Sequence, residues 1–289
     1  MDILRIQQDN LIQSTSLAHV RDFYEEIEWK DRLIGIKGAR GVGKTTLMIQ
    51  RMKLAFPNLE EVRYISLDNI WFSNHSLIDY VYSVYKEGIT HIFIDEIHHL
   101  ERWEQYLKNI YDSFPELHIV FTGSSLLEID HSIADLSRRL LMFDMPGLSF
   151  REYLEFKGCK YPKFSLSEIL YDNIKLTNSV NPEQNMVRKF HSYLKHGYFP
   201  FFLKGRETEY LSRVAKIVST VIEKDIPSME NIDYVSLMKA KQLLGILSEQ
   251  TPSTLDLEKI AMNMAISKNL NFCIEGEFLI VTLAPFKYQ

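Results

Sequence analysis

A glycine-rich stretch near the N-terminus constrains this chain more than any other feature of its sequence. Gly38, Gly43, Lys44 and Thr45 occupy the fixed positions of the pattern G-x-x-x-x-G-K-[ST]. Glycines let successive backbone N–H groups converge on phosphate oxygens, and a helix that begins at the lysine directs the positive end of its dipole to the same place. Because an apolar run precedes the pattern and an amphipathic segment follows it, we predict a strand, a phosphate-binding loop and a helix in that order.

The residue types in this loop predict a binding site for ATP together with Mg²⁺. Lys44 is expected to reach the β- and γ-phosphates, and the hydroxyl of Thr45 is expected to ligate Mg²⁺. The pattern does not by itself distinguish ATP from GTP, because the base is recognised by residues outside it. The expected nucleotide-binding residues of the loop are Gly38, Ala39, Arg40, Gly41, Val42, Gly43, Lys44, Thr45 and Thr46.

Two acids close a later apolar run and complete the expected site. Asp95 and Glu96 follow the run HIFI at 91–94, which has the length and composition of a buried strand. At the end of such a strand Asp95 can hold Mg²⁺ together with Thr45, and Glu96 can polarise a hydrolytic water as a general base. The alternative, a pair of solvated acids after a buried strand, explains the acids but not their combination with the Gly-Lys-Thr pattern.

Segments typical of strands and helices alternate over the first half of the chain. This alternation predicts an α/β fold in which a parallel sheet forms the middle of three layers and helices cover both of its faces. A long helix is expected first, over 3–29. The expected strands cover 32–37, 62–67, 91–96, 117–121 and 140–145, and the helices between them cover 44–56, 77–85 and 103–114.

Polar residues after the fourth expected strand form a further part of the site. In ATP-binding sheets with an inserted central strand, this strand lies between the phosphate strand and the acid strand, so its polar end approaches the γ-phosphate. Thr122 and Ser124 are therefore candidate sensors of that phosphate. A helix N-cap at Ser124 or Ser125 is an alternative that does not exclude the first.

A resemblance to a known family rests on four segments: GARGVGKTTL (38–47), IFIDEIHHLERWEQYL (92–107), FTGSSLLEI (121–129) and DLSRRLLMFDMPGLSFREYL (135–154). They resemble the bacterial and archaeal AAA-type P-loop ATPases in which a domain of unknown function follows the ATPase domain. The resemblance implies a P-loop NTPase fold, with nucleotide and Mg²⁺ at Lys44 and Thr45 and hydrolysis supported by Asp95 and Glu96. Members of the family continue well beyond the length of this chain, which implies a C-terminally truncated member.

The resemblance also draws attention to one arginine. The family often has a small residue, a glycine and an arginine in succession where this chain has Ser137, Arg138 and Arg139. Arg139 matches the family arginine, which implies a finger on the γ-phosphate of its own or of a neighbouring subunit. A finger in a neighbouring subunit requires a homo-oligomer. The alternative is a pair of surface arginines bonded to Asp135 or Asp144.

The pattern of the chain changes after the expected sheet. Helical periodicity replaces strand alternation, so we divide the chain into an ATPase domain with its N-terminal helix (1–157), a helical region (158–240) and an incomplete winged-helix-like segment (241–289). Between residues 239 and 289 five lysines and five acids cancel, which gives DNA binding little support. A winged helix can equally contact a protein, so an unidentified protein partner stays open.

Composition limits the binding partners and the cellular location that we expect for the chain. Lys and Arg number 33 against 38 Asp and Glu, a net charge of −5 that provides no general attraction to nucleic acid or anionic membranes. No segment has the features of a signal peptide or the length of a membrane span, so we expect a cytoplasmic protein without a membrane partner. Cys159 and Cys273 have no metal-motif spacing, and His98 and His99 are interpreted as core or helix-start residues.

Three functions are consistent with these patterns. The first is an AAA-type ATPase in which Mg²⁺-dependent hydrolysis, with Lys44, Glu96 and Arg139 as catalytic residues, drives a conformational change in the C-terminal helices. The second is a nucleotide-gated switch that regulates DNA or a protein with little turnover. The third, phosphoryl transfer to a small molecule, fits the acid pair and the long helical extension less well. Glu96 favours the first function, because a switch needs no general base.

Overall fold

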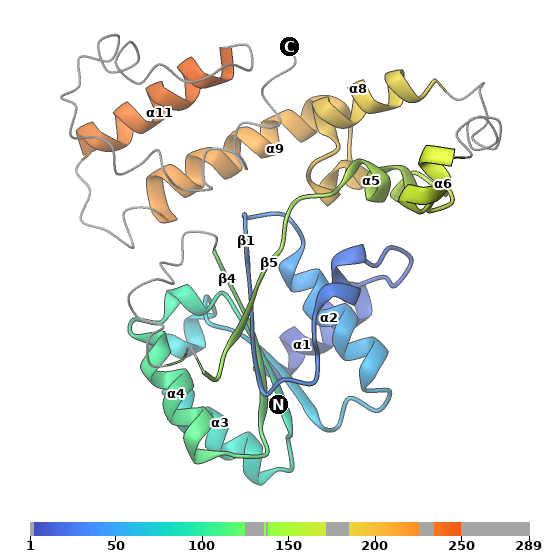
Figure 1. Ribbon diagram of the computed structural model, residues 1–289. Helices are drawn as coiled ribbons and strands as arrows, with labels where there is room; N and C mark the ends of the chain where they lie inside the picture. The colour runs from blue at the N-terminus through green and yellow to red at the C-terminus, as the bar shows by residue number, and fades with distance from the viewer. Residues whose placement is uncertain (1–2, 125–135, 137, 172–184, 226–233, 250–289) are drawn as a thin grey trace. The chain divides into compact units, whose positions relative to one another are not determined.

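The computed structural model describes residues 3–124, 136, 138–171, 185–225 and 234–249 (Figure 1). The chain divides into two compact units, residues 1–146 and 147–289, and each is described by itself. The division falls eleven residues before the end of the ATPase domain expected from the sequence, at residue 157, so the helix that begins at Phe150 belongs with the second unit.

The first unit is built on a five-stranded parallel sheet with the strand order β2-β3-β4-β1-β5. This order confirms the predicted parallel sheet and places β4 between the phosphate strand β1 and the acid strand β3, as expected. Because all strands are parallel, their carboxyl ends meet at one edge of the sheet. The strands are β1 (Leu33–Gly38), β2 (Val62–Ser66), β3 (His91–Asp95), β4 (His118–Ser124) and β5 (Leu141–Asp144).

Helices cover both faces of this sheet, which gives the predicted three layers. Figure 1 shows α1 and α2 on one face and α3 and α4 on the other. The four helices are α1 (Ile3–Ser14), α2 (Lys44–Ala55), α3 (Leu77–Lys86) and α4 (Trp103–Ser113). Short 3₁₀ turns lie at Asp22–Glu26, Ile70–Ser73 and Ile97–His99.

The continuous helix expected over 3–29 is wrong, because α1 ends at Ser14. Side chains of α2 bond the backbone carbonyls of the segment that follows. Lys53 Nζ donates to the carbonyl of Thr15 at 2.6 Å, and Gln50 Nε2 donates to the carbonyls of Ser16 and His19 at 2.9 and 2.8 Å. These tertiary bonds satisfy the backbone of a non-helical segment that apolar spacing alone does not distinguish from a helix.

Buried apolar side chains lie on both faces of the sheet, and the largest cluster lies between the sheet and the helices α3 and α4. Strands buried on both faces explain why the sequence shows apolar runs here and no alternation. Trp103, Leu107 and Ile110 share one face of α4 and are buried in this core. The ring of Trp103 lies 5.5 Å from that of Phe121 on β4, measured between centroids, so α4 is fixed directly on the central strands.

The second unit is helical over its described residues, which agrees with the expected helical region. A capping box begins α5, since Ser149 and Glu152 each bond the other's backbone N–H. Tyr193 on α8 donates from its hydroxyl to the carbonyl of Leu148 at 2.8 Å, which ties α8 to the start of α5. The helices are α5 (Phe150–Phe156), α6 (Leu166–Tyr171), α8 (Met186–His196), α9 (Glu207–Thr220) and α11 (Tyr234–Glu249), with a 3₁₀ turn at Pro200–Lys204 and a π-helical turn at Val221–Asp225.

Residues 250–289 lie outside the described part of the chain, so the winged-helix-like end stays a prediction. Cys273 lies in the same segment. No helix among the described residues is long and apolar enough to cross a membrane.

Leu107→Ala tests whether α4 closes the core as described. Leu107 is fully buried, and its truncation leaves a cavity, so we expect the free energy of unfolding to fall by about 2–5 kcal/mol. Asn109→Ala on the exposed face of the same helix is the control, with an expected change within about 0.5 kcal/mol. The three tryptophans, Trp29, Trp71 and Trp103, all lie in the first unit, so urea unfolding followed by tryptophan fluorescence reports this unit. Equal midpoints for the two variants would contradict the assignment.

Candidate active site

The phosphate-binding loop connects β1 to α2 in a conformation that its glycines permit. Gly41 and Gly43 have φ angles of 90° and 104°, a left-handed region that side chains with a Cβ rarely adopt. Gly38 has an extended backbone but no room, because an added Cβ would lie 2.5 Å from the carbonyl oxygen of Met145. Val42 between the two left-handed glycines is fully buried and anchors the loop on the core. Backbone conformation or close packing therefore explains the residue type at each of these four positions.

Lys44 is the first residue of α2, and its charge is enclosed by the loop. Its side chain is buried, with the residue 6% exposed, and Nζ donates to the carbonyls of Gly38 at 2.8 Å and Ala39 at 3.2 Å. A lysine ammonium has three donors and no acceptor, so it is suited to bonding further oxygen atoms brought into the loop. Of the remaining predicted loop residues, Arg40 and Thr46 have exposed side chains.

Asp95 ends β3 and is the centre of the site. It is 3% exposed, and its carboxylate accepts hydrogen bonds from three hydroxyl groups. Thr45 Oγ1 donates to Oδ2 at 2.6 Å, the hydroxyl of Tyr64 donates to the same oxygen at 2.8 Å, and Thr122 Oγ1 donates to Oδ1. The structure thus brings together Thr45 and Asp95, the two predicted Mg²⁺ ligands. A hydroxyl and a carboxylate are hard oxygen donors, the kind that Mg²⁺ prefers, so these residues fit that ion.

Thr122 connects Asp95 to the neighbouring acid. Its hydroxyl donates to Asp95 and accepts from the backbone N–H of Glu96 at 3.1 Å. Glu96 has a φ of 55° and a ψ of 49°, a left-handed conformation that costs a residue with a Cβ roughly 1–2 kcal/mol. The polar anchor on Thr122 holds the backbone in this conformation at the end of β3. Of the two candidate sensors, Thr122 is therefore part of the site, whereas the side chain of Ser124 lies outside the described residues.

Burial and nearby charges set the protonation of Glu96 and of its partner His98. Burial raises the pKa of Glu96, and the positive charge of Lys44 partly opposes this shift. Burial lowers the pKa of His98 to about 4, so its ring is neutral at pH 7. Glu96 Oε2 lies 3.2 Å from His98 Nε2, a contact that a neutral ring makes as an N–H donor. The candidate general base is therefore already bonded in this structure.

Arg139 lies away from the loop of its own chain. It lies two residues before the start of β5, at the amino edge of the sheet, whereas the loop follows the carboxyl end of β1. Its guanidinium donates to the two carboxylate oxygens of Asp112 at 3.1 and 3.3 Å. Asp144, one of the partners considered from the sequence, pairs instead with Lys37 at 3.1 Å, and Asp135 lies outside the described residues. A finger role for Arg139 stays a prediction and, from this position, concerns a neighbouring subunit.

Two residues of the site were not predicted from the sequence. Tyr64 resembles any other apolar strand residue, but its hydroxyl reaches Asp95 because β2 pairs with β3. Burial and the nearby Asp95 carboxylate raise the pKa of Tyr64, which keeps the phenol protonated as a donor. Arg21 is 5% exposed and donates to the carbonyls of Val42 and Pro146, both at 3.1 Å. It therefore ties the loop to the segment after β5.

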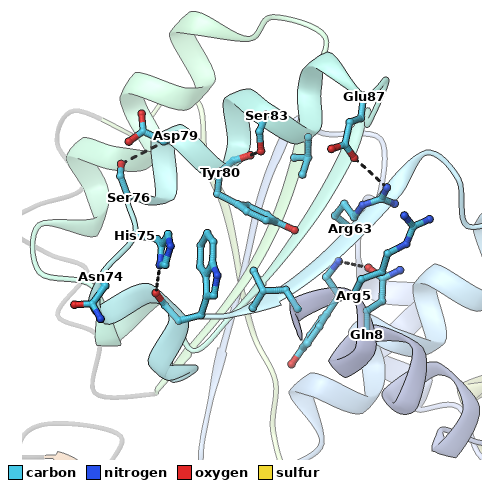
Figure 2. Close-up of a pocket in the computed structure, with 14 residues that line it drawn as sticks. Arg5, Gln8, Arg63, Asn74, His75, Ser76, Asp79, Tyr80, Ser83 and Glu87 are labelled. Carbon is cyan, nitrogen blue, oxygen red and sulfur yellow. Dashed lines mark hydrogen bonds and ion pairs between the residues drawn. The ribbon is translucent and has the colours of Figure 1, made fainter. Parts of the chain in front are cut away.

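A cavity of about 430 Å³ lies elsewhere in the first unit, between α1, β2 and α3 (Figure 2). Its lining contains none of the loop residues 38–46 and neither of the two acids. Arg63 on its wall pairs with Glu87 at 3.5 Å, and Tyr64, whose hydroxyl bonds Asp95, also lines the cavity. The nucleotide site is assigned by the loop and the acids and not by this cavity.

Comparison with known proteins agrees with this geometry. Residues 30–154 match a family model for an AAA domain. This segment is an AAA domain. It is a nucleotide-binding domain of the P-loop type, and the match confirms the resemblance seen in the sequence motifs.

The AAA domain and the residues after it have archaeal relatives. The chain is 30% identical over 281 residues to the uncharacterized protein MJ1637 of Methanocaldococcus jannaschii, covering 89% of this chain and 58% of that protein. It is 23% identical over 273 residues to MJ1544 of the same organism, covering 88% and 57%. The chain thus spans little more than half the length of these curated relatives. Among solved structures, the chain is 15% identical to Caenorhabditis elegans PCH-2, with a TM-score of 0.39. The match covers 75% of this chain and 62% of that one, and the likeness is too slight to support any statement about the fold.

Thr122→Val tests the connection between the two acids. Valine keeps the shape of threonine but removes one donor to Asp95 and the acceptor for the N–H of Glu96, so we expect the free energy of unfolding to fall by roughly 1–3 kcal/mol. Thr122→Ser keeps the hydroxyl and is the matched control, which should recover most of this loss. Urea unfolding followed by tryptophan fluorescence measures both. A Thr122→Val variant as stable as the wild type would show that the hydroxyl does not stabilise the fold, and a loss in Thr122→Ser as large as in Thr122→Val would show that the methyl group contributes as much as the hydroxyl.

Proposed function

We propose that this chain hydrolyses ATP with Mg²⁺ and that nucleotide state changes the conformation of its C-terminal helical region. The single observation that carries the proposal is the buried Asp95, whose carboxylate joins Thr45 at the start of α2 to Thr122 on the central strand. A carboxylate this deeply buried is costly for stability alone, whereas it has a clear use beside a loop built to hold phosphates.

Binding depends on the loop and on Lys44. The backbone N–H groups of the loop and the dipole of α2 favour a triphosphate, and the Lys44 ammonium bonds its terminal phosphates in addition to the loop carbonyls. Thr45 and Asp95 would hold Mg²⁺, directly or through water. When bound there, Mg²⁺ neutralises charge on the β- and γ-phosphate oxygens.

Hydrolysis depends on Glu96. Its carboxylate follows Asp95 directly and lies within electrostatic reach of Lys44. To act as the general base it exchanges its bond from His98 for a bond from the attacking water, whose proton it accepts. Thr122 holds the backbone N–H of Glu96 while the side chain makes this exchange.

A nucleotide-gated switch with little turnover is the second candidate, and one observation favours it. The carboxylate of Glu96 is held by His98 in this structure, so the base is not poised toward water. If that bond persists with ATP bound, the chain retains ATP without hydrolysing it. Its partner would then be a protein or, less in keeping with the charge balance, DNA.

Glu96→Gln separates these two functions. The amide keeps the size of the side chain but cannot accept the proton, so we expect ATP affinity to be retained and turnover to fall by about 10²–10⁴-fold. Lys44→Ala removes the ammonium from the loop and should abolish ATP binding. Both are measured by calorimetric titration of ATP and by release of inorganic phosphate. Wild-type turnover in Glu96→Gln would remove the general-base role, and undiminished ATP affinity in Lys44→Ala would remove the site assignment.

We also propose that Arg139 completes the site of a neighbouring subunit in a homo-oligomer. Its position at the amino edge of the sheet supports this, because it is far along the strands from the loop of its own chain.

Mixing two inactive variants tests the arrangement. In an equimolar mixture of Glu96→Gln and Arg139→Ala chains, some sites combine an intact base with an intact arginine from the neighbour, so about a quarter of the sites should regain activity. Arg138→Ala is the control for loss of an adjacent, exposed arginine and should stay active by itself. Phosphate release from the mixture is compared with the sum of the separate variants. No gain over that sum would exclude the finger in trans.

A further inference from the structure

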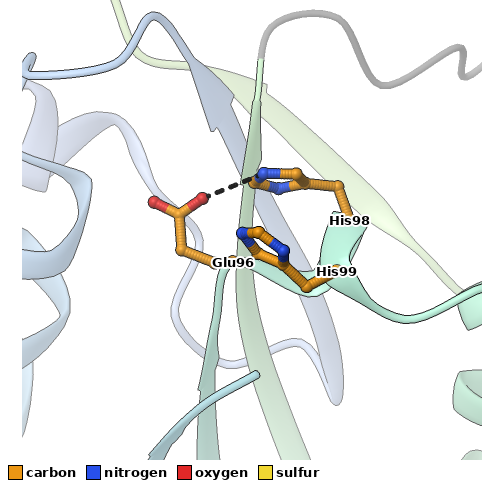
Figure 3. Close-up of side chains that lie close together, drawn as sticks. All are labelled: Glu96, His98 and His99. Atoms are coloured by element: carbon orange, nitrogen blue, oxygen red, sulfur yellow. Dashed lines mark ion pairs between the residues drawn. The ribbon is translucent and has the colours of Figure 1, made fainter. Parts of the chain in front are cut away.

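Three side chains that follow β3 converge on one small volume near the phosphate-binding loop (Figure 3). One carboxylate oxygen of Glu96 and one ring nitrogen from each of His98 and His99 all lie within 4.8 Å of one another. The left-handed Glu96 and the 3₁₀ turn Ile97–His99 bring these close sequence neighbours onto the same side of the chain. Within the part of the chain that the structure describes, no other group of three acid, histidine or cysteine ligands meets so closely.

The spacing of these atoms suits a tetrahedral metal ion. Zinc binds histidine nitrogen and carboxylate oxygen at about 2.0–2.2 Å, so neighbouring ligand atoms around a tetrahedral ion lie about 3.3 Å apart. Glu96 Oε2 and His98 Nε2 are 3.2 Å apart, which already matches the distance expected between two ligand atoms. His99 is exposed, so rotation of its side chain can bring its nitrogen the remaining distance. Three protein ligands leave the fourth position to water.

The two ring nitrogens of His98 have different surroundings. The side chain is only 9% exposed, and its Nδ1 has no hydrogen-bond partner among the described residues. Its other nitrogen faces Glu96, whose oxygen is the second ligand of the group.

The chemistry of the group selects the class of metal. Imidazole nitrogens favour zinc, cobalt, nickel and copper, whereas Mg²⁺ prefers oxygen donors such as Thr45 and Asp95. The two sites therefore discriminate between two classes of ion. Lys44 and Arg40 act electrostatically on His98, so binding should be weaker than at a structural zinc site.

We propose that Glu96, His98 and His99 bind a divalent transition metal of the zinc type and that this metal slows ATP hydrolysis by occupying Glu96. The first part stands on the geometry of the three side chains. The second part rests on the proposed function, because a carboxylate bound to a metal ion cannot accept a proton from water.

Cobalt provides a direct test of binding. Co²⁺ is titrated into the EDTA-treated full chain without nucleotide, in excess Mg²⁺ so that the oxygen site is occupied. We expect one equivalent of Co²⁺ to produce the visible absorption of a four- or five-coordinate nitrogen and oxygen site, and Zn²⁺ to displace it. Absence of this absorption, or its persistence under excess Zn²⁺, would overturn the proposal.

Variants assign the site to these residues. His98→Gln together with His99→Gln should weaken Co²⁺ binding by more than about tenfold. His99→Gln alone keeps the buried ring and should also weaken binding, which covers the case in which the double variant is unstable. His91→Gln with His118→Gln is the matched control, since the centroids of these rings lie 4.7 Å apart, against 4.6 Å for His98 and His99, but they belong to no three-ligand group among the described residues. Unchanged affinity in His99→Gln, or an equal loss in the control pair, would overturn the assignment.

Phosphate release in the presence of Zn²⁺ tests the second part separately. Zn²⁺ should inhibit the wild-type chain at concentrations that saturate the site, and the His98 and His99 variants should lose this inhibition relative to their own rates without Zn²⁺. Inhibition that is unchanged in these variants would overturn the regulatory role. A chain that binds Co²⁺ as expected but never hydrolyses ATP would overturn the proposed function and leave the metal site supported.

Discussion

The buried carboxylate of Asp95 is the constraint on which the site and much of the sheet depend. A buried carboxylate without partners costs several kcal/mol, and here three hydroxyl donors from three elements offset that cost. Hydrogen bonds to a charged acceptor are stronger than those between neutral groups, so the three donors are also held in place by the charge they satisfy. The hydrogen bonds of the site therefore also stabilise the sheet in its observed strand order.

That order follows from which element brings each donor. Thr45 comes from the first turn of α2, Tyr64 from the edge strand β2 and Thr122 from the central strand β4. If β4 lay anywhere but beside β3, its hydroxyl could not reach Asp95, and the N–H of Glu96 would lose its acceptor. The strand order thus has a chemical reason in addition to its apolar packing.

Much of the fold and of the candidate site could be predicted from the sequence, because short residue patterns specify local geometry. The loop follows from residue types at fixed spacing along one strand–loop–helix unit, and the parallel sheet follows from the alternation of strand and helix segments. The meeting of Thr45 with Asp95 follows from a separate apolar run that ends in an acid. The role of Tyr64 could not, since it depends on which strand pairs with β3. The end of α1 could not either, because Gln50 and Lys53 compete for backbone carbonyls from a distant element.

The position of His98 and His99 beside Glu96 could not be predicted from the sequence for a different reason. Spacing alone does not bring both histidines beside Glu96, because an extended chain would put Glu96 and His98 on one side and His99 on the other. The left-handed backbone of Glu96, followed at once by a 3₁₀ turn, removes that separation. The backbone conformation of four residues therefore brings the three side chains together.

Glu96 and His98 have several features that lower the stability of the fold. Glu96 has a left-handed backbone and a partly desolvated carboxylate, and His98 has a buried nitrogen without a partner. Strain of this kind persists where function requires it and is otherwise easily removed by substitution. In the structure the carboxylate of Glu96 bonds the neutral ring of His98. Under the proposed function it must instead bond the attacking water, and at the proposed metal site it would bind a transition metal. These bonds exclude one another, so under both proposals the bond between Glu96 and His98 would govern whether the AAA domain hydrolyses ATP.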